Sequence, residues 1–536
     1  MIITPKQLWQ DFDPLELEFA QTIVREEELT LHTEQYIYFN GVKTLDGVIR
    51  VCAKFYKPKI DSGAAIVVFD DIFNSIDAFD PSSYLSAGFS VLVVDYAGEN
   101  NDNMRYTIYP SSLNYCNYHK NNDILNMGGN PHETCWYIWG IIAMRATAYL
   151  ENLKFKYRFA LGFGHGGEQV WKACFIENAI LAGATVFGGG LFNSEDLAYK
   201  TALDSSSYAI SANAPVFIQV TSNELNNSLD EMSELYQTAS VSGARFSILE
   251  RSMHCIDYNR VNNPLLWFLL FLQREFVDND KLQENLCECP PSILIHVSEQ
   301  KLYCNVIVPD FTTLESIELF VAYGTNSPST RYWRNVELKM VSESEYLAVL
   351  DSPNTELPLY IYATAKYKSG LYLSSTVLNA TPKLLGIEAS KQNFKRLLYD
   401  TDLGISNWTI PNNNESHFAL SIKEGPLGLT GLTSNANRIS TYMLADDEFK
   451  AGENLSLQCM IYSKTLQEVT FIILCSKTFK RFVYEKSFEK SESWEKLSLS
   501  LENFKLEGNS LKDWNNVLTF SIYSKEELLL SSMLWV

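Results

Sequence analysis

Two residues in the first half of the chain could form an acid–base pair. Glu224 follows the strand-like run PVFIQVT, and His254 follows the run ARFSILE. A carboxylate that orients an imidazole is the pair with which many enzymes activate a hydroxyl or a water. Earlier in the chain, residues 162–167 read Gly-Phe-Gly-His-Gly-Gly between a strand-like run and a helix-like run. In this chain order, the segments predict a site for acyl-transfer chemistry.

The glycine-rich turn fits the G-x-nucleophile-x-G pattern, in which small residues flank a strained residue at the tip of a sharp turn. Gly162, Gly164 and Gly166 occupy the three key positions, so the tip is Gly164, which has no side chain with which to attack. The backbone N–H of His165 and one from the loop at Asp71 would supply the oxyanion hole. The pattern therefore predicts a hydrolytic site that lacks its nucleophile.

A second interpretation of the turn is a dinucleotide-binding loop, because Gly162, Gly164 and Gly167 also satisfy G-x-G-x-x-G. That loop normally belongs to the first strand–helix unit and has an acidic residue about 20 positions later. Here the turn follows several strand-like runs, and residues 188–190 are Gly-Gly-Gly where the acid would stand. We favour the nucleophile turn and expect no cofactor.

Other groups could attack in place of the missing side chain. A water activated by His254 and Glu224 fits best, because a glycine at the tip leaves room for it. The His165 side chain should point away from the site of attack, and the thiols of Cys116 and Cys255 stand at distances that the sequence does not give. The sequence therefore leaves open whether any catalysis remains.

The elements that must hold these residues alternate between strand-like and helix-like runs over residues 1–275. Buried strands are predicted at AAIVVFDD and FSVLVVDYAGE, and the helix HETCWYIWGIIAMRATAYLENL leads into the glycine-rich turn. The alternation predicts a mostly parallel sheet with helices on both faces. The apolar run PLLWFLLFL is too short for a membrane span and is predicted to be a buried helix.

The second half of the chain has a different pattern of apolar and polar residues. Residues 276–292 mix charges with Pro-Pro and are predicted to be a linker. Residues 293–382 contain alternating runs such as LYIYATAKYKSGLYLSS, which predict a small antiparallel β-sandwich. Residues 383–536 predict a second all-strand domain. The expected fold class is therefore α/β, followed by two β-sandwich domains.

The α/β part, residues 1–275, resembles an α/β-hydrolase of the acetyl xylan esterase and cephalosporin deacetylase type. The resemblance rests on GFGHGGEQVW at the turn, RATAYLENL before it, YTIYPSSLNYCNY in an insertion and the closing MHCIDY. It implies that Gly164 replaces the family's serine and that His165 replaces its glutamine. It also implies that Glu224 corresponds to the family's aspartate and His254 to its catalytic histidine.

The second half resembles accessory domains of polysaccharide-degrading enzymes. Residues 293–382 are similar to an immunoglobulin-like or fibronectin-like spacer, in which RYWRN at 331–335 could form an interface. Residues 383–536 resemble a jelly-roll carbohydrate-binding module. The resemblance rests on STYMLADDEFKAGENLSLQCMIYS and the closing KLEGNSLKDWNNVLTFSIYSKEELLLSSMLWV. Such modules stack aromatic rings on sugars, and the candidate rings are those of Trp408, Trp494, Trp514 and Trp535. Tryptophans in strands more often lie in the core, and Trp535 is predicted to do so.

Composition excludes several partners. The formal net charge of −21 repels nucleic acid and anionic membrane surfaces, so neither is an expected partner. The start MIITPKQLWQDFDP lacks the pattern of a secretory signal, and the ten cysteines lack the dense spacing of a disulfide scaffold. We therefore expect reduced thiols and a cytoplasmic location. Cys287 and Cys289 have no second ligand pair nearby, so no metal site is predicted.

Three functions follow from these patterns. The first is a degenerate, esterase-like hydrolase that binds a carbohydrate or sugar ester without cleaving it. The second is an active carboxylic ester hydrolase that uses water or an unrecognised nucleophile with His254 and Glu224. The third is an assembly protein in which the sandwiches make the contacts. A small-molecule or carbohydrate ligand is the expected partner, and the sequence does not give the oligomeric state.

Overall fold

The structure is a computed structural model. It describes residues 2–99, 105–121, 130–177, 179–187, 197–224, 227–240, 243–275, 288–324, 327–352, 354–388, 395–413, 415, 417–451, 455–475 and 478–536. Most of the predicted linker, residues 276–287, lies outside the described residues, and so does the Gly-Gly-Gly segment at 188–190.

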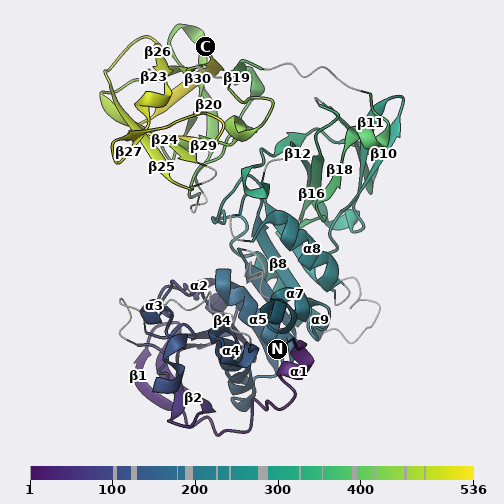
Figure 1. The fold of residues 1–536 in the computed structure, drawn as a ribbon, viewed down its shortest axis with the longest axis vertical. Coiled ribbons are helices and arrows are strands. Elements are labelled where there is room, and N and C mark those ends of the chain that lie inside the picture. Colours follow the sequence, from purple (N-terminus) through teal and green to yellow (C-terminus); the bar gives the residue numbers. More distant parts are fainter. Residues whose placement is uncertain are drawn as a thin grey trace.

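A mixed nine-stranded sheet forms the centre of the first half, in the order β1-β2-β3-β5-β4-β6-β7-β8-β9 (Figure 1). Along this order, the pairs from β1 to β5 are antiparallel and the pairs from β5 to β9 are parallel. The strands are β1 (Thr22–Glu28), β2 (His32–Lys43), β3 (Val48–Pro58), β4 (Ala64–Phe69), β5 (Ser90–Val94), β6 (Tyr157–Phe163), β7 (Ala182–Val186), β8 (Val216–Thr221) and β9 (Arg245–Leu249).

Helices cover both faces of this sheet. They are α1 (Pro5–Leu8), α2 (Ser82–Ser86), α3 (Tyr118–Asn121), α4 (Cys135–Asn152), α5 (Gly167–Phe175), α6 (Leu197–Ala202), α7 (Ser205–Ala209), α8 (Leu229–Ala239) and α9 (Asn263–Glu275). Alternate residues of β4 face different cores: Val67 packs with α4 and α5, whereas Ile66 packs with α2 and α9. Because a central parallel strand is buried on both faces, AAIVVF is a continuous apolar run.

The predicted buried helix PLLWFLLFL lies within α9. Trp267 and Phe268 are buried in the core that α9 shares with α2 and the sheet. No helix among the described residues is long and apolar enough to cross a membrane.

The middle part is built from two antiparallel sheets with a common core. One has the order β10-β11-β15-β14 and the other β13-β12-β16-β17, with β18 beside β16. Val306 of the first sheet and Leu319 and Ile361 of the second are fully buried in the same cluster. The strands are β10 (Ser292–Ser298), β11 (Lys301–Ile307), β12 (Leu314–Tyr323), β13 (Arg334–Val336), β14 (Lys339–Ser342), β15 (Glu345–Leu350), β16 (Leu359–Tyr367), β17 (Tyr372–Ser374) and β18 (Leu378–Ala380).

The C-terminal part is a second pair of antiparallel sheets. One has the order β20-β21-β30-β23-β26 with β19 beside β30, and the other β22-β29-β24-β25-β27-β28. The strands are β19 (Leu397–Asp400), β20 (Leu420–Glu424), β21 (Thr430–Ser434), β22 (Arg438–Thr441), β23 (Leu457–Ser463), β24 (Gln467–Cys475), β25 (Arg481–Phe488), β26 (Glu495–Leu499), β27 (Lys505–Leu506), β28 (Asn509–Ser510), β29 (Val517–Tyr523) and β30 (Leu528–Trp535). Trp535 is buried in the core between the sheets, as predicted, together with Trp408 and Trp514. The predicted fold class, α/β followed by two β-sandwiches, is confirmed.

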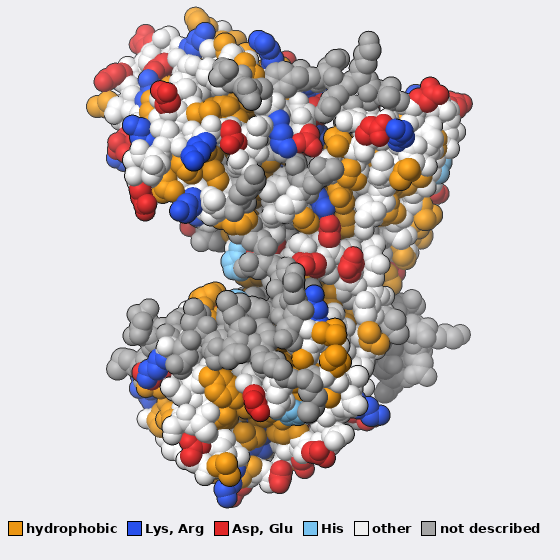
Figure 2. All heavy atoms as spheres, viewed as in Figure 1, with side chains coloured by type: hydrophobic (Ala, Val, Ile, Leu, Met, Phe, Trp, Pro, Cys, Tyr) orange, Lys and Arg blue, Asp and Glu red, His pale blue; other side chains and the backbone are white. Residues whose placement is uncertain are grey.

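The RYWRN segment joins the three parts. The segment was predicted to form an interface, and in the structure its contacts are made within the chain: Arg331, Tyr332 and Trp333 are buried where the parts pack together. The Arg331 guanidinium donates to both carboxylate oxygens of Asp230 in α8, at 2.5 and 2.7 Å. Arg334 forms ion pairs with Asp446 and Glu448 of the C-terminal part. The surface is hollowed between the first half and the C-terminal sheets (Figure 2).

Candidate active site

The glycine-rich turn joins β6 to α5 through one turn of 3₁₀ helix, η4 (Gly164–Gly166). Gly166 packs against backbone, since a Cβ there would lie less than 3.0 Å from the carbonyl oxygen of Phe69. Gly164 has a φ of +49°, in the left-handed region that glycine adopts without steric cost. The turn therefore has the sharp strand-to-helix geometry of a nucleophile elbow, with a glycine at its tip.

The carboxylate of Asp71 fills the space beside this tip. A Cβ on Gly164 would lie less than 3.0 Å from the Oδ2 atom of Asp71, well inside van der Waals contact. Asp71 belongs to the loop after β4, the neighbour of β6 in the sheet, so its side chain reaches across the ends of the two strands. The room that the glycine was expected to leave for a water is taken by a carboxylate oxygen.

Three nitrogen atoms hold the Asp71 carboxylate. The backbone N–H of His165 donates to Oδ2 at 3.3 Å, and the Nδ1 atom of the same residue lies 3.3 Å from that oxygen. The backbone N–H of Phe73 donates to Oδ1 at 3.2 Å. Burial alone would raise the pKa of Asp71, but the hydrogen bonds and charge of His165 and the backbone N–H groups outweigh it. The pKa is therefore lowered, and Asp71 is an anion at neutral pH.

Both predicted oxyanion donors are engaged with carboxylates. The N–H of His165 binds the Asp71 side chain, and the N–H of Asp71 donates to Oδ1 of Asp70 at 2.7 Å. Each N–H would have to be released before it could stabilise an oxyanion. A role for His165 and Asp71 in an oxyanion hole stays a prediction.

Glu224 and His254 come together at the same end of the sheet. The Nδ1 atom of His254 lies 3.3 Å from Oε1 of Glu224, and Oε2 of Glu224 accepts a hydrogen bond from the Thr221 hydroxyl at 2.9 Å. The Glu224 side chain is 2% exposed, whereas that of His254 is 55% exposed. Glu224 raises the pKa of His254 through its hydrogen bond and charge, against an opposing effect of burial. Asp71 adds to the rise, so its charge also acts on the imidazole.

The backbone of His254 is fixed in an uncommon conformation. Its φ is +47°, and its N–H donates to the Thr221 hydroxyl at 3.3 Å. The imidazole stacks on the ring of Phe187, with centroids 4.3 Å apart. Thr221 thus holds both members of the pair, because its hydroxyl donates to Glu224 and accepts from His254.

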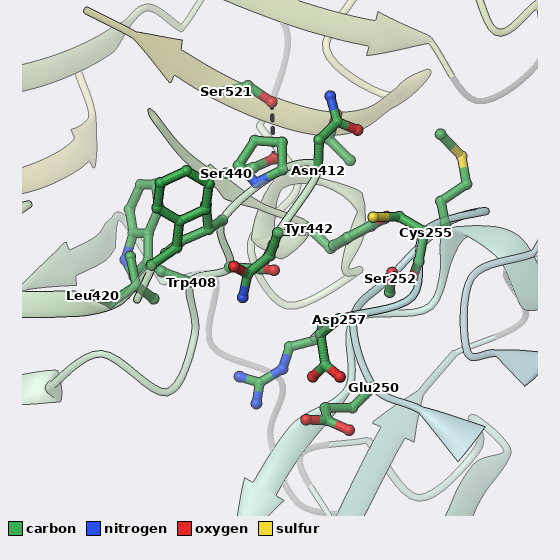
Figure 3. Close-up of a pocket in the computed structure, with 18 of the residues that line it drawn as sticks. Glu250, Ser252, Cys255, Asp257, Trp408, Asn412, Leu420, Ser440, Tyr442 and Ser521 are labelled. Carbon is green, nitrogen blue, oxygen red and sulfur yellow. Dashed lines mark hydrogen bonds between the residues drawn. The ribbon is translucent and has the colours of Figure 1, made fainter. Parts of the chain in front are cut away.

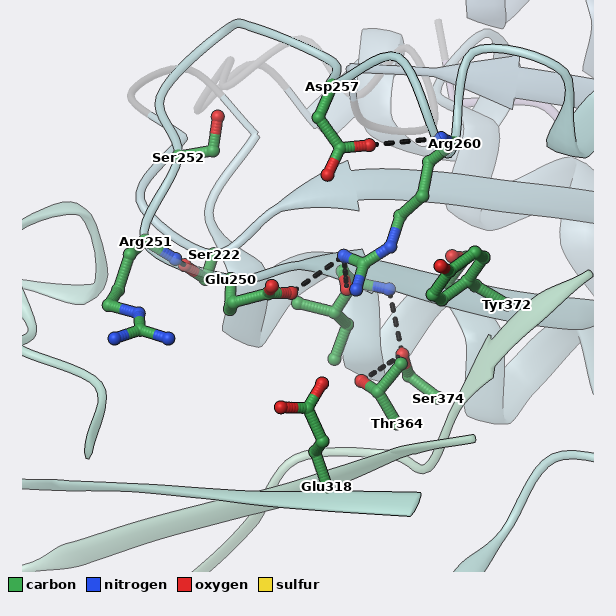
Figure 4. A network of polar contacts seen from close by, with 12 residues as sticks. Ser222, Glu250, Arg251, Ser252, Asp257, Arg260, Glu318, Thr364, Tyr372 and Ser374 are labelled. Atoms are coloured by element: carbon green, nitrogen blue, oxygen red, sulfur yellow. Dashed lines mark hydrogen bonds and ion pairs between the residues drawn. The ribbon is translucent and has the colours of Figure 1, made fainter. Parts of the chain in front are cut away.

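The loop between β9 and α9 that carries His254 is tied down by a polar network (Figure 4). Arg260 donates to the Glu250 carboxylate at 2.7 Å and to the carbonyl of Ile248 at 2.8 Å. Its guanidinium lies over the ring of Tyr372 in the middle part, 4.6 Å from the centroid. The hydroxyl of Ser374 accepts from the N–H of Ile248 at 2.9 Å. The middle part therefore helps to position the loop.

The arrangement brings together an imidazole, a carboxylate that binds it and a second carboxylate at the tip of the glycine-rich turn. The other predicted attackers fit poorly: Cys116 is fully buried, and burial raises the pKa of Cys255, which disfavours its thiolate. No group of three His, Cys, Asp or Glu side chains within the described ranges is arranged to hold a metal ion. Sequence reasoning named Asp71 for its backbone and missed its carboxylate, because nothing in the pattern indicates where a loop side chain points.

The sequence matches no family model and no curated protein. Among solved structures, the chain is similar to an acetyl xylan esterase from Paenibacillus sp. R4, with 12% identity and a TM-score of 0.36 over 49% of this chain and 91% of that one. It is also similar to acetyl xylan esterase 1 from Thermoanaerobacterium sp. JW/SL YS485, with 11% identity and a TM-score of 0.36 over 50% and 95% of the two chains. A glucuronoyl esterase from Solibacter usitatus has 11% identity and a TM-score of 0.33 over 44% and 82%. Likenesses this weak carry no argument about the reaction.

Proposed function

We propose that this chain is a catalytically degenerate, esterase-like hydrolase that binds a carbohydrate or a sugar ester without cleaving it. One observation carries the proposal: the Asp71 carboxylate lies where a side chain at position 164 would project. A triad enzyme without its nucleophile keeps roughly a 10³- to 10⁴-fold rate over water, largely from its oxyanion hole and from binding. Here the His165 N–H of that hole binds Asp71 instead, so even this residual rate is expected to be lost.

The retained side chains support binding of a hydroxyl-rich ligand. The half-exposed imidazole of His254 can donate a hydrogen bond, and the Asp71 carboxylate can accept one. The half-buried ring of Phe187, on which the imidazole of His254 stacks, adds the apolar part of its exposed edge to this site.

The test is hydrolysis of a chromogenic acetate and of acetylated xylose by the wild type, by His254→Ala and by a control, His296→Ala. His296 is exposed on β10, far from the elbow in sequence and on another sheet. We expect all three proteins to give the rate of buffer alone. A wild-type rate that His254→Ala abolishes and His296→Ala leaves intact would contradict the proposal.

A second function is favoured by the ionised state of Asp71 beside the His254–Glu224 pair. In this scheme the Asp71 carboxylate attacks the acyl carbon of an ester, and the C–O bond to the alcohol breaks. Protonated His254 gives its proton to the departing alkoxide. His254, now neutral, takes a proton from a water that hydrolyses the resulting anhydride and restores the carboxylate.

Substitutions of Asp70 and Asp71, the two acids in the loop after β4, distinguish the two functions. If Asp71 is the nucleophile, the wild type hydrolyses esters, both Asp71→Asn and His254→Ala abolish the rate, and Asp70→Asn retains it. Asp70 is the matched control because it lies on the same loop and its Oδ1 accepts hydrogen bonds that an asparagine can also accept. A rate that survives in Asp71→Asn excludes this scheme.

A further inference from the structure

A cavity of about 460 Å³ lies between the His254-bearing loop and the C-terminal part (Figure 3). Residues 249–253, 255 and 257 of the loop form one wall, and the C-terminal part forms the other. The volume falls within the range of small-ligand pockets, roughly 300–1,000 Å³. Gly164, Asp71, Glu224 and His254 do not line it, so the cavity is distinct from the elbow site.

The lining combines aromatic rings with hydrogen-bonding groups. Rings come from Trp408, Phe418, Tyr442 and Tyr523 of the C-terminal part. Hydroxyl and amide groups come from both walls, among them Ser252, Asn412, Ser440 and Ser521 (Figure 3). Ring faces that pack on C–H surfaces, with hydroxyls and amides at the edges, suit a compact, hydroxyl-rich molecule.

The charges at the cavity balance one another. The lining carries two carboxylates, Glu250 and Asp257, and two guanidinium groups, Arg251 and Arg481, so its formal charge is zero. No excess of either sign is left to select an anion or a cation. A neutral ligand therefore fits better than a charged one.

The two neighbours of His254 in the chain connect the cavity to the imidazole. Met253, which precedes His254, packs against the core of the C-terminal part, and Cys255, which follows it, lines the cavity. From the opposite wall, buried Tyr442 lies near enough to Glu224 for the charge of that carboxylate to act on the phenol. A ligand in the cavity would therefore touch the segment on both sides of His254.

We infer that this cavity binds a neutral sugar and that its occupancy changes the surroundings of the His254 imidazole. The inference rests on the proposed function only for the class of ligand. It places that ligand at a site between two domains, behind the loop that carries His254.

Calorimetric titration of the full chain tests the inference, with methyl β-xyloside, xylotriose and N-acetylglucosamine as neutral probes and glucuronate and glucosamine as charged ones. We expect saturable binding of at least one neutral probe and weaker binding of the charged ones. Tyr523→Ala should weaken the binding by about tenfold or more, because it removes a half-buried ring from the lining. Tyr462→Ala should not, because Tyr462 lies on β23 in the other sheet and does not line the cavity.

The second readout is the imidazole NMR signal of His254, which should shift on saturation while that of His296 stays in place. Three results would overturn the inference: no saturable binding of any neutral probe, binding that Tyr523→Ala leaves unchanged, or an unmoved His254 signal. Binding that is lost in His254→Ala but kept in Tyr523→Ala would place the ligand at the elbow site. That result would support the proposed function while excluding the cavity.

Discussion

At the scale of residues, the position of the Asp71 side chain depends on the glycine at position 164. The Asp71 carboxylate can lie at the elbow tip only because Gly164 has no Cβ, and any side chain at position 164 would collide with it. The His165 N–H, free to bind an oxyanion in an open elbow, is here a donor to the carboxylate. A side chain could therefore be introduced at position 164 without a collision only if Asp71 were changed as well.

Glu224 is expected to set the titration of His254. Its hydrogen bond and charge raise the pKa of the imidazole, which favours the protonated form. Glu224→Gln removes the charge, so the pKa of His254 should fall toward the ordinary value of about 6.5. An NMR titration of the imidazole measures the pKa of His254 in each variant. Glu231→Gln, which alters the cap of α8, is the control and should leave the value unchanged; an unmoved pKa in Glu224→Gln would mean that the pair is not formed in solution.

At the scale of elements, α5 contains a buried ion pair close to the glycine-rich turn at which the helix begins. Lys172 donates to Glu168 at 2.8 Å, the two side chains are 0% and 1% exposed, and the hydroxyl of Tyr199 also donates to Glu168. Burial raises the pKa of Glu168 to about 7, although the charge of Lys172 opposes the rise. The helix that begins at the glycine-rich turn therefore depends on both partners being present.

Removal of one partner of this ion pair should destabilise the protein. Lys172→Met leaves a buried carboxyl without its cation and should lower the free energy of unfolding by roughly 3–5 kcal/mol. The double variant Lys172→Met/Glu168→Leu removes the unpaired group and should recover most of that loss. Denaturant unfolding followed by tryptophan fluorescence compares the variants. A double variant no more stable than Lys172→Met would show that the ion pair is not the cause.

The strands that position the site could be predicted because each central strand is a continuous apolar run. The runs at β4, β5, β8 and β9 were therefore found, and parallel strands end at the same edge, which brings Glu224 near His254. The direction of the Asp71 side chain could not be predicted, because it depends on hydrogen bonds to His165 and Phe73 that form only in the folded loop. The partners of RYWRN could not be predicted for a related reason: the burial of Trp333 comes from contacts between parts of the chain that are far apart in sequence.

At the scale of the whole molecule, the His254-bearing loop is where the three parts meet. The middle part holds β9 through Ser374, and its Arg331 carbonyl accepts from the Asn223 side chain, next to Glu224, at 2.8 Å. The C-terminal part packs on Met253. The appended sandwiches are thus parts of the support for the candidate site.

Arg331 should couple the middle part to the first half. Its guanidinium binds Asp230 with both nitrogens and lies 3.4 Å from the ring centroid of Tyr360. Arg331→Met should therefore speed amide hydrogen exchange in α8 by about tenfold, because local opening there becomes easier. Arg158→Met is the matched control, since Arg158 donates to the carbonyls of Ala179 and Phe155 and pairs with Glu151, all within the first half. Unchanged exchange in α8 would contradict the coupling.

The most direct test of the account is whether serine at the elbow works only when Asp71 is gone. Gly164→Ser, Asp71→Ala and the double variant are compared with the wild type on a chromogenic acetate. We predict that the wild type and both single variants stay at background, because Asp71 collides with the serine in one and no nucleophile exists in the other. The double variant should gain at least about a hundredfold, since nucleophile and oxyanion donor are both restored, and His254→Ala should remove the gain. Equal activity of Gly164→Ser and the double variant, or turnover by the wild type itself, would contradict the claim that Asp71 closes the site.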